Sequence, residues 1–154
     1  MLPKMNEHSP ASLLQQLVGV ECWAAQLVNG EELQLEFGAE VPSPTRRHPR
    51  LTVGEWTLIV ASPAWDVDGV PWKQFAQDDD ELTSTLRRLE NRVTAANLDV
   101  MTSSLELRFA SFASLRIRAQ REDSRGPDWE FFLPGARVIV AGPGKRWTLQ
   151  SAYE

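Results

Sequence analysis

The chain has little of what most catalytic and metal sites need. Its 154 residues include one cysteine, Cys22, and two histidines, His8 and His48. A single cysteine excludes an intramolecular disulfide and provides no cysteine cluster for a metal ion. No apolar run approaches the roughly 18 residues of a membrane-spanning helix. The net charge is -5, whereas binding to nucleic acid or to an anionic membrane requires an excess of positive charge. We therefore expect neither nucleic acid nor a membrane as a partner.

Segments that superficially suggest ligand binding lack the required spacing. Gly142-Pro143-Gly144-Lys145 is followed by Arg146 rather than by the Ser or Thr of a phosphate-binding loop. Asp66 to Gly69 begins like a calcium loop but lacks the distal ligands. Consecutive acids at Asp78 to Glu81 suit the N-terminus of a helix. The sequence thus predicts no metal, no cofactor and no enzymatic activity.

The N-terminal residues do not predict a secretory signal peptide. Residues 1–10, MLPKMNEHSP, have two prolines and no apolar stretch of the necessary length. Together with the lack of disulfides, this predicts a cytoplasmic protein. We expect residues 1–10 to form a flexible tail and residues 11–154 to form one domain.

The remaining chain has the composition of a globular protein, and its patterns predict short strands with two helices. Hydrophobic residues make up 42% and charged residues 24%. Asn29-Gly30 is typical of a tight hairpin turn between two strands. The predicted helices are Ser12–Val18 and Leu82–Glu90, capped by Ser12 and Asp80; the predicted strands are 20–28, 31–37, 51–53, 56–61, 65–67, 93–101, 105–109, 115–119, 129–133, 137–141 and 147–149.

The two halves of the sequence resemble each other. An offset of 72 residues aligns seven identical residues, all at positions expected to be buried: Leu14, Leu17, Ala24, Val28, Leu33, Leu35 and Phe37 with Leu86, Leu89, Ala96, Val100, Leu105, Leu107 and Phe109. Two unrelated helix-then-hairpin units would also share some leucines, so this alternative stays open. The pattern predicts an α+β fold, mainly β, in which two pseudo-repeated helix-plus-antiparallel-hairpin lobes (about 12–70 and 80–150) share one core.

Acidic residues gather in the first predicted hairpin. They are Glu31, Glu32, Glu36 and Glu40. Strand alternation places Glu32 and Glu36 opposite the apolar face, where they could meet a cationic partner. The second hairpin is basic, with arginines at 108, 116 and 118. Each charged face could equally be an ordinary solvated sheet surface.

Six tryptophans form a second group of candidate binding residues. We expect Trp65, Trp72 and Trp147 to be the most exposed of them. The alternative is that the tryptophans pack in the core of a small β protein.

A set of spaced residues runs along the chain: Gly54-Glu55-Trp56, Leu58, Trp129, Leu133-Pro134-Gly135, Arg137-Val138, Val140 and Gly142. In this set the chain resembles small uncharacterised bacterial proteins found beside polymorphic toxins, and several such families are regarded as immunity proteins. The resemblance implies a non-enzymatic cytoplasmic binding protein.

The sequence therefore favours a binding or inhibitor protein, in the manner of an immunity protein, whose acidic surface meets a cationic toxin domain. The alternatives are a structural or self-associating module, which includes a homodimer, and an enzyme of unknown class.

Overall fold

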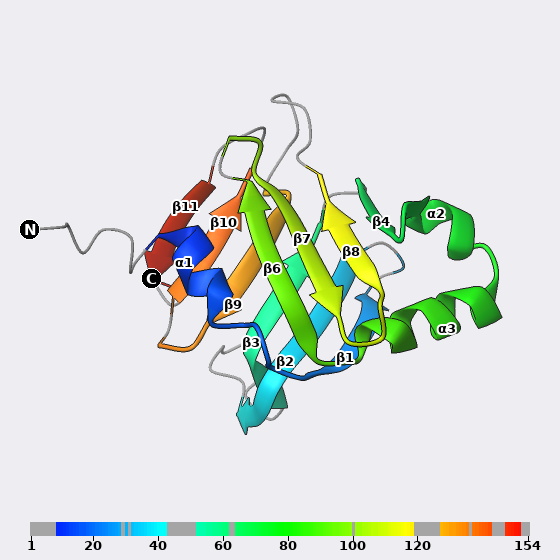
Figure 1. The fold of residues 1–154 in the computed structure, drawn as a ribbon, viewed down its shortest axis with the longest axis horizontal. Helices are drawn as coiled ribbons and strands as arrows, with labels where there is room; N and C mark the ends of the chain where they lie inside the picture. Colours follow the sequence, from blue (N-terminus) through cyan, green and yellow to red (C-terminus); the bar gives the residue numbers. More distant parts are fainter. Residues whose placement is uncertain are drawn as a thin grey trace, which may run out of the picture.

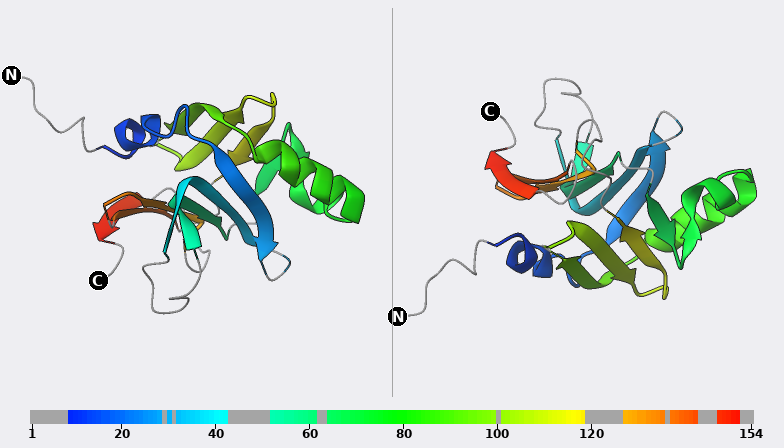
Figure 2. Two further views of the ribbon diagram at one scale, coloured as in Figure 1. Left: turned by 90° about the horizontal axis from the view of Figure 1, so that it is seen from below. Right: turned by 90° about the horizontal axis from the view of Figure 1, so that it is seen from above.

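The computed structural model describes residues 9–28, 30, 32–42, 52–61, 64–99, 101–118, 127–135, 137–142 and 147–151. They form a mainly β fold, as the sequence predicts. Two antiparallel sheets stack face to face (Figures 1 and 2). The helices are α1 (Pro10–Gln15), α2 (Trp72–Phe75) and α3 (Asp79–Leu89). The strands are β1 (Cys22–Val28), β2 (Glu32–Pro42), β3 (Thr52–Val60), β4 (Trp65–Val67), β5 (Val70–Pro71), β6 (Val93–Asp99), β7 (Ser104–Phe109), β8 (Ser114–Ile117), β9 (Trp129–Leu133), β10 (Arg137–Ala141) and β11 (Trp147–Ser151).

Each sheet combines strands from both parts of the sequence. The six-stranded sheet has the order β1-β2-β3-β9-β10-β11, and the five-stranded sheet has the order β5-β4-β8-β7-β6. Thus β9 to β11 extend the sheet begun by β1 to β3, whereas β4 and β5 extend the sheet of β6 to β8. In Figure 1 the five-stranded sheet lies in front, with α3 beside it.

The core lies between the two sheets. Strand alternation points every second side chain inward, and the six residues predicted to be buried, Leu33, Leu35, Phe37, Leu105, Leu107 and Phe109, are at most 2% exposed. That prediction is confirmed. Aromatic contacts extend the same layer, with Phe131 5.7 Å from Phe37 and 6.0 Å from Trp56 between ring centroids.

The strand registers contain matching irregularities. A bulge lies between Cys22 and Ala24 in β1, and another between Val93 and Ala95 in β6. In β2 and β3, Leu33 pairs with Val60, which in turn pairs with Trp129. In β7 and β8, Leu105 pairs with Ile117, which in turn pairs with Trp65.

An antiparallel bridge between Glu21 and Arg92 joins the starts of the two hairpins. The backbone N–H of Gly38 donates to the carbonyl of Glu21, and that of Ala110 donates to the carbonyl of Arg92. The two hairpins are therefore tied together at corresponding ends.

Both principal helices begin earlier than the sequence predicts. The side chain of Ser9 accepts a hydrogen bond from Ser12 N at 3.1 Å, so Ser9 caps α1 and Pro10 takes its first position. Asp78 caps α3 by accepting from the backbone N–H groups of Asp80 and Glu81. The predicted caps, Ser12 and Asp80, each lie inside the first turn.

β3 runs through Gly54, where the sequence predicts a break between two strands. A Cβ at this position would collide with the backbone carbonyl oxygen of Phe37. Gly54 therefore does not interrupt the strand; it lets β2 and β3 approach closely at the register shift that follows Phe37.

Candidate functional site

The outer face of the six-stranded sheet carries a glutamate in apolar surroundings. Glu130 on β9 lies directly across from Ile59 on β3 and from Val140 on β10. Phe132 follows two residues later and shares this face. All four side chains are half-buried. This set, Glu130 with Ile59, Phe132 and Val140, together with nearby Glu32, is called the acidic face below.

The carboxylates of the acidic face are electrostatically unfavourable. Burial among apolar neighbours raises the pKa of Glu130 above its ordinary value of 4.5, and the negative charge of Glu32 raises it further. Within the described residues, no hydrogen bond or ion pair joins either side chain to a donor or a cation. Two like charges are thus held near each other without compensation.

In the five-stranded sheet, the carboxylates in a comparable row of cross-strand neighbours are paired with arginines. There Arg116 on β8 pairs with Glu106 on one side and with Asp66 on the other. Ile59 holds the same place in the six-stranded sheet, where it pairs with Gln34 and Glu130. Arg116 donates to Glu106 at 3.0 Å, and Arg108 donates to the same carboxylate at 3.1 Å.

These two arginines, Arg116 first, lower the pKa of Glu106 below 4.5. Arg118 pairs with Asp66 at 3.7 Å. The three arginines that the sequence indicates as a basic patch therefore serve largely as internal counter-ions.

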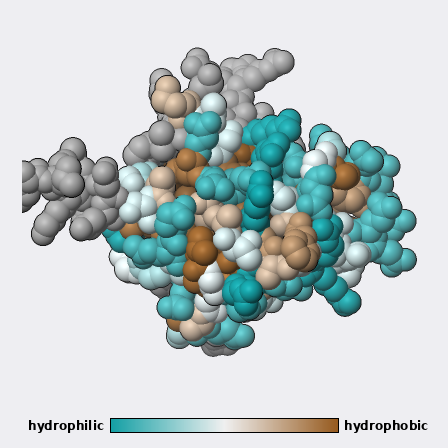
Figure 3. All heavy atoms as spheres, in the orientation of Figure 1, coloured by the Kyte–Doolittle hydropathy of each residue, from teal (hydrophilic) through white to brown (hydrophobic). Residues whose placement is uncertain are grey.

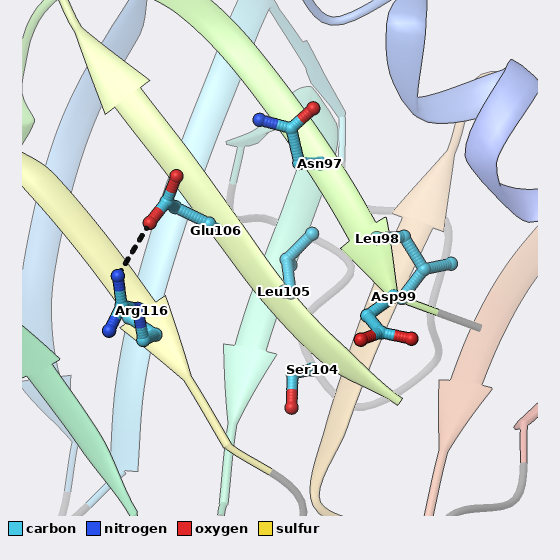
Figure 4. Close-up of a pocket in the computed structure, with 7 residues that line it drawn as sticks. All are labelled: Asn97, Leu98, Asp99, Ser104, Leu105, Glu106 and Arg116. Carbon is cyan, nitrogen blue, oxygen red and sulfur yellow. Dashed lines mark hydrogen bonds and ion pairs between the residues drawn. The ribbon is translucent and has the colours of Figure 1, made fainter. Parts of the chain in front are cut away.

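An open depression lies on this second face, along β6 and β7, with a volume of about 290 Å³. Figure 4 shows Glu106 and Arg116 joined to each other at one end, and Asp99 and Ser104 at the other. Polar side chains of several residues reach its lining. Its lining consists of Asn97, Leu98, Asp99, Ser104, Leu105, Glu106 and Arg116, which includes neither a histidine nor a cysteine.

The structure contradicts the predicted exposure of Glu36. Its side chain does point away from the core face, yet the residue is only 4% exposed. The carboxylate accepts hydrogen bonds from the backbone N–H of Gly54, the hydroxyl of Thr57 and the amide of Gln34. Glu36 thus joins β2 to β3 and is not free to meet a partner.

The other predicted acidic residues are distributed unevenly. Glu32 is half-buried beside Glu130, whereas Glu40 is exposed farther along β2. Glu31 lies outside the described residues. Glu130 was not predicted from the sequence, because its partners on β2 and β3 are distant in sequence and only the sheet order brings them together.

The predicted exposure of the tryptophans is wrong for Trp65 and Trp72. They are 2% and 8% exposed, and their rings stack with centroids 5.9 Å apart. Phe75 packs edge-on against Trp65 at 5.7 Å. The backbone of Trp147 belongs to β11, but its side chain lies outside the described part of the chain. The alternative of core packing therefore holds for Trp65 and Trp72.

Figure 3 shows mainly hydrophilic residues over β7 and β8, with a tan patch where these strands meet the end of α3. The β7–β8 turn carries an exposed aromatic residue, Phe112, which is 93% exposed. The sequence pattern offered no signal for it, because turn residues have no face defined by periodicity.

The described residues contain no group of three or more His, Cys, Asp or Glu side chains placed to hold a metal ion. Burial raises the pKa of Cys22 to about 12, so its thiol stays protonated. Among the described helices, none is long and apolar enough to cross a membrane. No protein-family model, curated protein or solved structure matches the chain.

Proposed function

We propose that this protein is a non-enzymatic binding or inhibitor protein whose acidic face receives a cationic side chain of a partner protein. The supporting observation is the half-buried Glu130 carboxylate, which lies beside Glu32 and lacks a counter-ion within the described residues. Burying such a charge is unfavourable unless an opposite charge approaches it. A partner arginine or lysine would supply that charge.

The comparison of the two sheet rows indicates where this cation would lie. In the five-stranded sheet, Arg116 occupies the position between two carboxylates. In the six-stranded sheet, the position holds Ile59, which contributes apolar surface but no charge. A guanidinium lying over Ile59 would meet Glu130, while its aliphatic part packed on Phe132. Arginine suits this arrangement because its planar group forms paired hydrogen bonds with carboxylates.

Inhibition is the form of binding that this face serves best. Toxins that act on nucleic acids present cationic clefts, and an acidic surface both steers the encounter and blocks such a cleft. The resemblance to proteins encoded beside polymorphic toxins points the same way, and it implies a cytoplasmic site of action. Glu40, exposed on the same strand as Glu32, would add to long-range attraction.

The experiment is affinity capture from the native host with matched variants. The test protein is the double variant Glu32→Gln and Glu130→Gln; the control is Asp79→Asn with Glu81→Gln, which removes the same charge from the exposed start of α3. A partner retained by the wild type and the control, released by salt and lost from the test variant supports the proposal. Equal retention by all three proteins would refute it.

The same proposal includes an internal duplication in which each half contributes its last strands to the other half's sheet: β4 and β5 from the first half, and β9 to β11 from the second. It is supported by the two matching bulges and by the equivalent pairing of Leu33 with Val60 and of Leu105 with Ile117. The Glu21–Arg92 bridge would then lie on the pseudo-twofold axis. Duplication lets one sheet keep its balanced ion pairs while the equivalent face of the other becomes a binding surface.

Self-association through oppositely charged hairpins receives less support. The arginines on the outer face of the five-stranded sheet are paired with Glu106 and Asp66 of the same sheet. They would have to exchange these partners to bind the acidic face of a second copy.

A further inference from the structure

The β7–β8 turn holds an aromatic side chain in solvent. Phe112 is 93% exposed, whereas Phe109, three residues earlier, is 2% exposed. Folding therefore gains apolar burial from one ring and almost none from the other.

The backbone at Phe112 is also unfavourable for its residue type. Its φ of 68° lies in the left-handed region, which glycine and asparagine adopt readily and bulky residues rarely do. Three- and four-residue hairpin loops commonly place glycine at such a position. Neither the backbone nor the ring of Phe112 thus contributes to stability, a combination typical of residues that serve binding.

The turn is held firmly on the protein. The hydroxyl of Ser111 donates to the carbonyl of Arg88 at 2.6 Å, and Ala110 N donates to the carbonyl of Arg92 at 2.8 Å. Phe112 N donates to the carbonyl of Phe109 at 2.9 Å. A ring presented on a fixed turn loses little conformational freedom on binding.

These contacts also place the turn beside basic residues. The turn packs on the C-terminal end of α3, which carries Arg87 and Arg88, and on the segment containing Arg92. Arg88 pairs with Asp68 at 2.6 Å. Within the described residues, Arg87 and Arg92 have no ion pair. The segments that hold the turn therefore carry three arginines, Arg87, Arg88 and Arg92, against Asp68 and Glu90, which is a small excess of positive charge.

We propose that the Phe112 turn is a second protein-docking point, which inserts the ring into an apolar pocket whose rim carries carboxylates. This goes beyond the proposed function, because the charge of this partner is opposite to that expected at the acidic face. The favoured occupant is a protein: one aromatic anchor in a pocket can dominate an interface. A membrane is disfavoured, since one ring provides little apolar area.

The experiment places the photocrosslinking amino acid p-benzoylphenylalanine at position 112 of the full chain in the native host. A second protein carries it at position 77, where Gln77 is exposed outside the turn. A protein that crosslinks to position 112 but not to position 77 is then purified. The Kd of its complex is measured with the wild type and with the variants. We expect Phe112→Ala to weaken binding about 30-fold and Phe112→Leu to weaken it less.

Two further measurements distinguish binding from folding and from the proposed function. Phe112→Gly should melt at a higher temperature than the wild type and still bind weakly, because it relieves the backbone while removing the ring. Glu32→Gln with Glu130→Gln should leave this Kd unchanged.

Three results would overturn the inference. They are the absence of a specific crosslink at 112, a Kd for Phe112→Ala within twofold of the wild type, and Phe112-dependent co-sedimentation with phosphatidylglycerol vesicles. The last result would assign the turn to a membrane.

Discussion

The Glu36 carboxylate accepts a hydrogen bond at 2.9 Å from the backbone N–H of Gly54, 18 residues farther along the chain. The contact spans the register shift between β2 and β3, where Gly38 adopts a φ of 79°. Glu55 makes a similar contact from β3 to β2, because its carboxylate accepts a hydrogen bond from Ala39 N at 2.9 Å. Two acidic side chains thus satisfy backbone groups that the irregular ladder leaves without strand partners.

Replacement of Glu36 should destabilise the fold. Glu36→Ala removes the acceptor for Gly54 N and the Thr57 hydroxyl, at a cost of about 2–3 kcal/mol in the free energy of unfolding. Urea denaturation measures this cost, with Glu32→Ala as the control, since Glu32 has no hydrogen-bond partner within the described residues. If the two variants lose equal stability, Glu36 is not the structural residue described here.

Mutation of two phenylalanines in one hairpin should affect the free energy of unfolding very differently. Phe109→Ala should cost about 3–5 kcal/mol, because it opens a cavity between the sheets. Phe112→Ala should change the stability by less than about 0.5 kcal/mol. Chemical denaturation of both variants checks the ranking, and a larger loss at Phe112 would contradict the assignment of core and turn.

Alternating patterns predicted much of this arrangement. Leu33, Leu35 and Phe37 alternate with polar residues, and a strand with one buried face must place them together. Trp65 and Trp72 were misjudged because neither lies in a segment long enough to show alternation: Trp65 begins the three-residue strand β4, and Trp72 begins α2. Their burial depends on α2, a four-residue helix that brings the two rings into a stack.

The acidic face was only half predictable. Alternation identified Glu32 as pointing away from the core, yet it placed Glu36 in solvent as well. Alternation defines the direction of a side chain; it does not show that a bulge and a neighbouring strand will cover it. Glu130 depends on β9 joining β3, a long-range pairing that no local pattern encodes.

The stability contributed by Glu130 should depend on pH in an unusual direction. Its pKa is raised in the folded state, so its favourable contribution exists in acid and is lost as the pH rises through the folded pKa. Glu130→Gln should therefore be more stable than the wild type at pH 7, and this gain should shrink as the pH falls through the folded pKa towards 4.5. Thermal melts across this pH range measure the difference in stability between the two proteins. A difference that is independent of pH would contradict a raised pKa as its cause.

Glu106 should behave in the opposite way. Its pKa is lowered, so its contribution is present at neutral pH and is lost as the pH falls from 4.5 through the folded pKa. Glu106→Gln should cost about 0.5–1 kcal/mol at pH 7, because its two arginine partners are largely exposed. The cost should fall in 1 M salt, where screening weakens the pairs. A cost that salt leaves unchanged would point to packing instead.

The association rate with the captured partner tests the central claim most directly. Stopped-flow measurements at several salt concentrations would compare the wild type with Glu32→Lys plus Glu130→Lys, after circular dichroism has shown that the variant is folded. Charges near an interface mainly steer association. We predict a rate at least about tenfold slower for the variant at low salt, and a difference that narrows as salt screens the charges. Equal rates and equal salt dependence would contradict the claim that the face of Glu32 and Glu130 receives a cationic partner.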